Sequence, residues 1–113
     1  MKNDHSMLRE LATFLGYTVI NAHDFLGLQI LDNLGVRRWW NPLADDGDAM
    51  RLSVDQNIVH TCGETEALAY HYSLSGLWSI QNKVLVVNGD KLAATRQAIC
   101  KAVIAIKGRN EKV

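Results

Sequence analysis

The strongest constraint on the fold is the segment around Pro42, the only proline of the chain. Proline has no backbone N–H to donate and biases the preceding Asn41 toward extended geometry, so a strand or turn should end there. The following residues suit a helix start, because Asp45 or Asp46 can accept hydrogen bonds from the free N–H groups of a first turn. Asp48 adds negative charge at the positive end of the helix dipole. The sequence therefore predicts a strand-to-helix junction here, with a helix that continues through residue 54.

The acidic run after Pro42 has a second interpretation as a cation site. Its three carboxylates, at positions 45, 46 and 48, are the ligand type that Ca²⁺ and Mg²⁺ take. The run lacks the alternating spacing and the distal glutamate of a calcium loop. We therefore prefer the helix cap and expect no metal at this position.

Length and charge restrict the class of protein and of partner. With 113 residues, of which 48% are hydrophobic, the chain can bury a core without disulfides or metals, and we expect one domain over residues 1–113. Twelve basic and twelve acidic residues give a formal net charge of zero. That balance removes the usual long-range attraction to nucleic acid or anionic lipid. We therefore expect no membrane association and no direct binding of nucleic acid.

Cysteine use and targeting signals bear on the compartment. The two cysteines, Cys62 and Cys100, both lie in apolar segments, which fits reduced thiols in a cytosolic compartment better than a disulfide framework. No signal peptide is visible, and no apolar run approaches membrane-spanning length. We expect an intracellular protein.

The first forty residues read as one helix followed by strands. Leucines and an alanine recur at helical spacing in residues 8–15, Ser6 or Asp4 can cap the start, and Gly16 suits the end. Short β-prone runs follow at residues 17–20, 28–31 and 36–40. The four residues 32–35 between the last two runs are good turn formers and predict a hairpin. A competing interpretation makes residues 25–34 a helix, because four of their aliphatic residues also match helical spacing.

The second half reads as three strands and a helix. Strands are predicted at residues 57–62, 67–73 and 83–87, separated by a turn at 63–66 and a longer connection at 74–82. Residues 84–87 are apolar on both faces, and a strand buried on both sides implies layers above and below its sheet. The last helix should run from Asp90 to Lys107, with Gly108 beyond its end. Its expected buried stripe is Leu92, Ile99, Ala102, Val103 and Ile106.

These elements predict an α+β protein. The expected order is α-β-β-α-β-β-β-α, with room for one further short strand near Tyr17, and the expected architecture is a three-layer α-β-α sandwich around a mainly antiparallel sheet.

One group of residues could carry metal or nucleophile chemistry. If residues 63–66 form a hairpin turn, His60, Cys62 and His71 share one face of the sheet, which would begin a zinc site. No close-spaced ligand pair such as C-x-x-C accompanies them, so we prefer an ordinary half-buried sheet face. A Cys–His nucleophile pair is weaker still, because neighbouring strand residues seldom face an oxyanion hole.

Other enzyme-like signals are scarce. The sequence has no phosphate-binding glycine loop and no nucleophile elbow, and the dipeptide His23-Asp24 is weak evidence for a hydrolase. We therefore expect a protein that is not an enzyme, with no catalytic residue, no cofactor and no metal.

The run Arg37-Arg38-Trp39-Trp40 is the best candidate for recognition. Indoles stack on other rings, and guanidinium groups donate two parallel hydrogen bonds to carboxylate or phosphate. In a strand, Arg37 and Trp39 share one face while Arg38 and Trp40 share the other, so one tryptophan could be core and the other open. Trp78 could join the same surface or plug the end of a sheet. The alternative is that both indoles of the run are core or sheet-covering residues. We take these five residues as the candidate partner-binding site.

Two segments resemble a known family. Residues 39–52, WWNPLADDGDAMRL, resemble the WNPL-x-DDGDALRL signature of small bacteriophage and prophage proteins with a phage ABA-sandwich domain. Residues 93–99, AATRQAI, are similar to the AATR-x-AI run that often ends members of that family. The resemblance implies a phage origin, hence a place in the cytoplasm of a bacterial host, and a sandwich fold. It implies no biochemical activity, and residues 17–25 match nothing in the family.

Two functions are compatible with these observations. The first is a phage accessory protein that binds a host protein or complex without catalysis and inhibits a defence component, such as a CRISPR effector, in an anti-CRISPR or other anti-defence role. The alternative is a small-molecule binder that sequesters a nucleotide immune signal in a cleft lined by tryptophan and arginine. A virion or DNA-processing role is disfavoured by the neutral charge.

Overall fold

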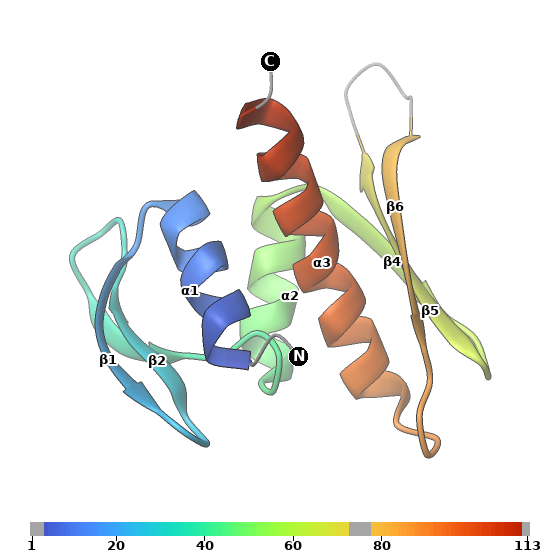
Figure 1. Cartoon of the computed structure of the whole chain (residues 1–113), viewed down its shortest axis with the longest axis horizontal. Coiled ribbons are helices and arrows are strands. Elements are labelled where there is room, and N and C mark those ends of the chain that lie inside the picture. Colours follow the sequence, from blue (N-terminus) through green and yellow to red (C-terminus); the bar gives the residue numbers. More distant parts are fainter. Residues whose placement is uncertain (1–3, 73–77, 112–113) are drawn as a thin grey trace. The chain divides into compact units, whose positions relative to one another are not determined.

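The computed structural model describes residues 4–72 and 78–111, and the chain divides into two compact units, Met1–Asn41 and Pro42–Val113. Each unit contains one three-stranded antiparallel sheet with helix packed on it (Figure 1). The order of elements along the chain is α-β-β-β-α-β-β-β-α. The predicted α+β class and the antiparallel pairing are confirmed.

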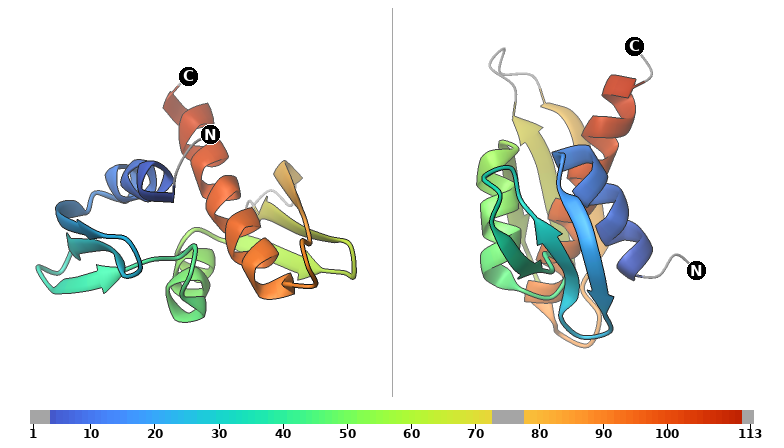
Figure 2. Two further views of the ribbon diagram at one scale, coloured as in Figure 1. Left: turned by 60° about the horizontal axis from the view of Figure 1, so that its bottom comes forward. Right: turned by 90° about the vertical axis from the view of Figure 1, so that its left-hand side faces the viewer.

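The Met1–Asn41 unit is a helix followed by a three-stranded meander. Helix α1 (Asp4–Leu15) precedes β1 (Thr18–His23), β2 (Gly27–Leu31) and β3 (Arg37–Trp40). Strand β2 is central, and α1 packs on β2 and β1 (Figure 2). The buried core of this unit comes from α1, β2 and β3. It contains Leu8, Leu11 and Ala12 of α1, Leu28 and Ile30 of β2, and Trp40 of β3.

Helix α1 ends where the glycine pattern predicts. Gly16 has a φ of 80°, which suits a residue without Cβ, and the Tyr17 N–H donates to the Ala12 carbonyl at 2.9 Å. The Asn33 side chain donates to the Leu15 carbonyl at 3.2 Å, so the turn between β2 and β3 also caps this helix. The local end signal and the tertiary contact agree.

The predicted hairpin at residues 32–35 is confirmed. Asp32 accepts hydrogen bonds from the N–H groups of Leu34 and Val36 at 2.9 and 3.0 Å, which fixes the turn between β2 and β3. Beyond the turn, Leu31 pairs with Arg37. The competing helix over residues 25–34 is therefore wrong, because the turn residues join two strands whose backbones pair.

The Pro42–Val113 unit holds the second sheet and two helices. Helix α2 (Asp46–Asp55) is followed by β4 (Ile58–Cys62), β5 (Glu66–Tyr72) and β6 (Trp78–Leu85), and by α3 (Lys91–Glu111). Strand β5 is central, α3 packs against all three strands, and α2 contacts α3 and β4. Small buried residues face this contact on both sides, with Ala67 and Ala69 in the sheet and Ala98 and Ala102 in α3. Small side chains allow the helix and sheet to pack closely.

The start of α2 confirms the predicted helix cap. Asp45 has extended backbone geometry, and its side chain accepts a hydrogen bond from the Asp48 N–H at 2.9 Å. Asp48 is buried and its carboxylate accepts from Arg51 at 2.8 Å. Two of the three acidic side chains are thus engaged in holding the helix.

Three boundaries differ from the sequence prediction. Residues 18–23 form a full strand, so the first sheet has one more strand than the main prediction. Strand β6 begins at Trp78 rather than at residue 83. Helix α3 continues through Gly108 to Glu111, because one glycine inside a helix costs only about 1 kcal/mol.

The stacking of layers is the part of the prediction that this fold does not support. It rested on residues 84–87 being buried on both faces, but Val84 is buried while Leu85 is 67% exposed. The described strands also form two sheets instead of one. The three-layer sandwich and the single domain therefore stay predictions. Within residues 4–72 and 78–111, no helix is both long and apolar enough to cross a membrane.

Candidate functional site

Strand β3 divides the Arg37–Trp40 segment between two faces of the first sheet. Trp40 is only 3% exposed and packs edge-on against Tyr17, with ring centroids 5.5 Å apart. Trp39 is 39% exposed, and Arg37 is exposed as well. The alternation expected for a strand is confirmed, with one core tryptophan and one open tryptophan on the side of Arg37.

Arg38 braces the hairpin instead of facing solvent freely. It is half-buried, and its Nε lies 3.5 Å from Oδ2 of Asp32, the carboxylate that also holds the turn. The pKa of Asp32 is lowered, chiefly by the hydrogen bond from the Val36 N–H. Partial desolvation acts against this, and the Leu34 N–H and Arg38 lower the pKa further. Of the predicted partner-binding residues, Arg38 and Trp40 thus help to stabilise the fold of this unit.

Trp39 belongs to an open aromatic cluster, which we define as His23, Phe25 and Trp39. The rings of His23 and Trp39 meet edge to face with centroids 6.0 Å apart, and His23 and Phe25 are also 6.0 Å apart. Phe25 is 84% exposed. A large ring so open to water is unexpected, because burying an aromatic side chain is strongly favourable.

The geometry of the cluster is set by the turn between β1 and β2. Nδ1 of His23 accepts hydrogen bonds from the N–H groups of Phe25 and Leu26, both at 3.2 Å. From α1, His5 Nε2 donates to the His23 carbonyl at 2.9 Å. These bonds hold the backbone of the turn and so fix the position from which the Phe25 side chain projects.

The sequence prediction missed His23 and Phe25. A register irregularity between Val19 and Asn21 shifts the alternation of β1, so the face on which His23 lies cannot be counted from the strand start. The only sequence signal was an aromatic residue next to turn formers. Trp78 remains open as a site residue. Its backbone begins β6, and its side chain lies outside the described residues.

The histidine and cysteine face of the second sheet has the register expected for it. Cys62 pairs with Ala67 and Ile58 pairs with His71, which puts His60, Cys62 and His71 on one face. In the part of the chain that the structure describes, no three side chains of metal-ligating type gather closely enough to hold an ion. The absence of zinc stays a prediction for chemical analysis.

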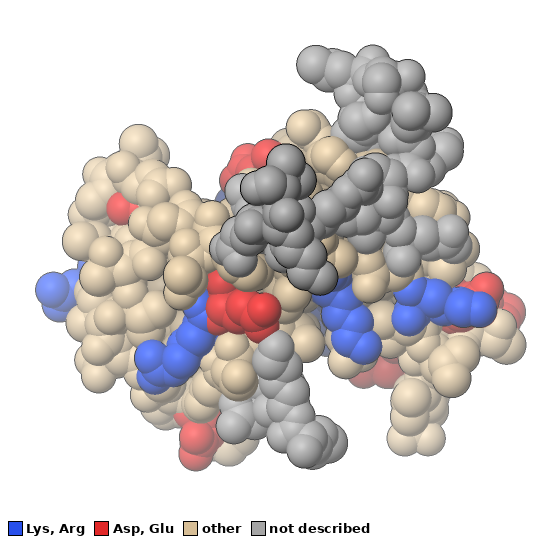
Figure 3. Space-filling view, turned by 45° about the horizontal axis from the view of Figure 1, so that its top comes forward, with Lys and Arg blue, Asp and Glu red and all other residues tan. Residues whose placement is uncertain are grey.

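One exposed ion pair lies beside Cys62. The Lys91 ammonium is 2.8 Å from the Glu64 carboxylate, and the pair raises the pKa of Lys91 and lowers the pKa of Glu64. Charges of both signs lie next to one another on the face drawn in Figure 3. Among the described residues that this view shows, neither sign forms a broad field that would attract a highly charged partner.

No protein-family model matches the chain, and no curated protein matches its sequence.

Proposed function

We propose that this chain is a phage or prophage accessory protein that acts in the cytoplasm of a bacterial host by binding a host protein, without catalysis. The observation that carries the proposal is the open aromatic cluster, with Arg37 on the same strand face as Trp39. Tryptophan and arginine dominate the energetics of protein interfaces, and aromatic residues are enriched in their cores.

The energetics of this surface favour a protein partner. Covering an exposed Phe25 would stabilise a complex by about 2 kcal/mol, the usual value for burying a large apolar side chain. The turn that carries Phe25 is already held by His23 and His5, so binding should cost little conformational entropy there. A surface that is preorganised and partly apolar is suited to recognition through shape.

We further propose that the partner is a host defence component, such as a CRISPR effector complex. This is supported by the resemblance to phage proteins, by the small size of the chain and by the open aromatic cluster. Since the formal net charge is zero, the association should depend weakly on salt.

The nucleotide-binding alternative has less support. Two pockets of the Pro42–Val113 unit measure about 150 and 270 Å³, too small for a nucleotide, since sites for drug-sized ligands measure roughly 300–1,000 Å³. Of the tryptophans that could line a cleft with arginine, Trp40 is buried. Calorimetry against cyclic nucleotides separates the alternatives, because sequestration requires a saturable heat that a protein binder does not give.

Affinity purification tests the proposal. A tagged chain expressed in a lysogenic or infected host should retain one host protein or complex, identified by mass spectrometry. Phe25→Ser should reduce its recovery, whereas Leu34→Ser, another highly exposed apolar residue of the same unit, should not. Equal recovery with both variants, or recovery of nothing above an unrelated tagged protein, contradicts binding through the aromatic cluster.

A further inference from the structure

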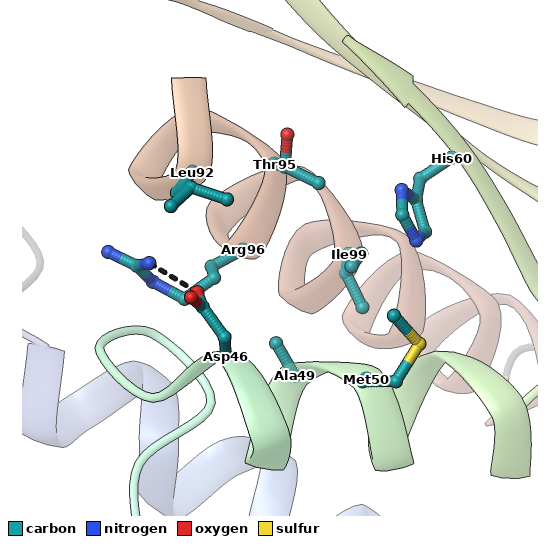
Figure 4. Close-up of a pocket in the computed structure, with 8 residues that line it drawn as sticks. All are labelled: Asp46, Ala49, Met50, His60, Leu92, Thr95, Arg96 and Ile99. Atoms are coloured by element: carbon teal, nitrogen blue, oxygen red, sulfur yellow. Dashed lines mark hydrogen bonds and ion pairs between the residues drawn. The ribbon is translucent and has the colours of Figure 1, made fainter. Parts of the chain in front are cut away.

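A pocket of about 150 Å³ lies within the Pro42–Val113 unit, lined by α2, β4 and α3 (Figure 4). Its apolar walls are Ala49 and Met50 from α2 and Leu92 and Ile99 from α3. Ile99 is buried, whereas Leu92 is 61% exposed and Met50 is exposed. The exposed position of Leu92 corrects its predicted place in the buried stripe of α3. The pocket therefore keeps apolar surface in contact with water, a condition that favours the binding of an apolar group.

The polar groups of the pocket lie at its two ends. At one end Arg96 Nη1 is 2.6 Å from Asp46 Oδ1, and Arg96 Nε donates to the Leu43 carbonyl at 2.9 Å. Because Asp46 compensates the charge of the guanidinium, this end favours a neutral ligand over an ion. At the other end the imidazole of His60 reaches from β4 toward the helices (Figure 4).

The pocket is also where the two segments of family-like sequence meet. Asp46, Ala49 and Met50 come from residues 39–52, while Thr95, Arg96 and Ile99 come from residues 93–99. Arg96 joins the segments directly, through its bonds to Asp46 and to the Leu43 carbonyl. The proposed function uses none of these pocket residues, which the packing of α2 against α3 brings together.

We propose that this pocket binds a small neutral aromatic molecule that carries one hydroxyl or amino group. A volume of about 150 Å³ suits a single six-membered ring, since an apolar cavity of about that size in another protein binds benzene. The ring would lie against Ala49, Met50 and Ile99. Its polar group would meet His60, whose imidazole offers a donor or an acceptor according to its tautomer. This site is separate from the proposed partner-binding surface and does not depend on it.

Phenol is the probe for a direct test with the full chain. Nuclear magnetic resonance titration should shift signals of the pocket residues with a dissociation constant on the order of 1 mM, which is attainable for seven non-hydrogen atoms. Leu92→Ala should weaken phenol binding about three- to tenfold, because it removes one wall. The matched control is Leu85→Ala, since Leu85 is a similarly exposed leucine of the same unit that lines a different cavity.

The polar end is tested by comparing ligands. His60→Leu should lower the affinity for phenol to that for benzene while leaving benzene binding unchanged, and benzoate should bind more weakly than phenol. An unchanged backbone spectrum should show that Leu92→Ala is folded, so the effect of this variant on phenol binding tests the site even if His60→Leu does not fold. The proposal is overturned if phenol shifts no pocket signal at 10 mM (about ten times the expected constant), if Leu85→Ala and not Leu92→Ala weakens binding, or if benzoate binds more tightly.

Discussion

Asp32 is the single residue on which the β2–β3 hairpin most depends. Its carboxylate accepts from two backbone N–H groups and lies beside Arg38, so the ionised form is favoured in the folded chain. The turn was predictable because aspartate before Asn-Leu-Gly is local turn chemistry. The ion pair between Asp32 and Arg38 was not predictable, because it depends on how β2 and β3 pair in the folded hairpin.

We predict that Asp32 titrates below the ordinary range of an aspartate side chain. Because folding lowers its pKa, the ionised carboxylate stabilises the folded chain above the pKa of the unfolded state, and this stabilisation is lost as pH falls through the lower folded pKa. A carboxyl-detected NMR titration should show the low midpoint, and Arg38→Ala should raise it. A midpoint equal to that of a short unfolded peptide covering residues 31–37 would contradict the hydrogen bonding described.

For the helices and strands, the sequence predicted those boundaries that depend on only one or two neighbouring residues. Gly16 ends α1 and Asp45 begins α2, because each end is decided by one or two residues. The exposure of Leu85 and Leu92 was not predictable in the same way, since periodicity shows which residues share a face but not what covers that face. The open aromatic cluster was missed for a related reason, an irregularity in the pairing of β1.

Two glycines of the Met1–Asn41 unit should respond differently to substitution. Gly27 has a φ of 85°, and a Cβ there would lie 2.6 Å from the Trp40 carbonyl oxygen, so the backbone of β3 would have to move. Gly35 has a similar φ of 81° with nothing within 4 Å of a Cβ. We expect Gly35→Ala to cost about 1–2 kcal/mol from backbone strain alone, and Gly27→Ala clearly more. Urea denaturation measures the free energy of unfolding of both variants. Equal losses would mean that Gly27 and the Trp40 carbonyl are not as close as described.

The buried stripe of α3 gives a second matched pair. Ile99 is 2% exposed, so Ile99→Ala should lower the free energy of unfolding by about 2–5 kcal/mol. Leu92→Ala removes an exposed aliphatic side chain from the same helix and should change it by less than about 0.5 kcal/mol. Chemical denaturation of the two variants distinguishes the faces. A negligible effect at Ile99 would mean that its face contacts solvent or a partner.

For the molecule as a whole, we predict folding without a structural metal. His60, Cys62 and His71 share a face, but the unit already buries aliphatic residues between α3 and its sheet, which can stabilise it without an ion. Elemental analysis of the purified chain should find no stoichiometric zinc, and its circular dichroism should not change on adding EDTA. One equivalent of zinc, with unfolding on adding EDTA, would mean that the fold depends on a metal.

If the chain works by recognition through the face of β3 that carries Arg37 and Trp39, substitutions on that face should weaken binding to the partner. Against the purified partner, Arg37→Ala and Trp39→Ala should each weaken binding by about 2 kcal/mol or more, with the fold intact. Alanine at His60, Cys62 or Asp48 should leave binding largely unchanged, and Leu34→Ala, at an exposed position of the same hairpin, serves as the control. The decisive variant is the folded double mutant Arg37→Ala/Trp39→Ala, studied by calorimetry. We expect the double mutant to bind the partner more weakly by at least the larger of the two single effects. Binding as tight as that of the unaltered chain would show that this face does not bind the partner, and turnover of a substrate that vanishes on substituting His60 or Asp48 would show that the chain is an enzyme.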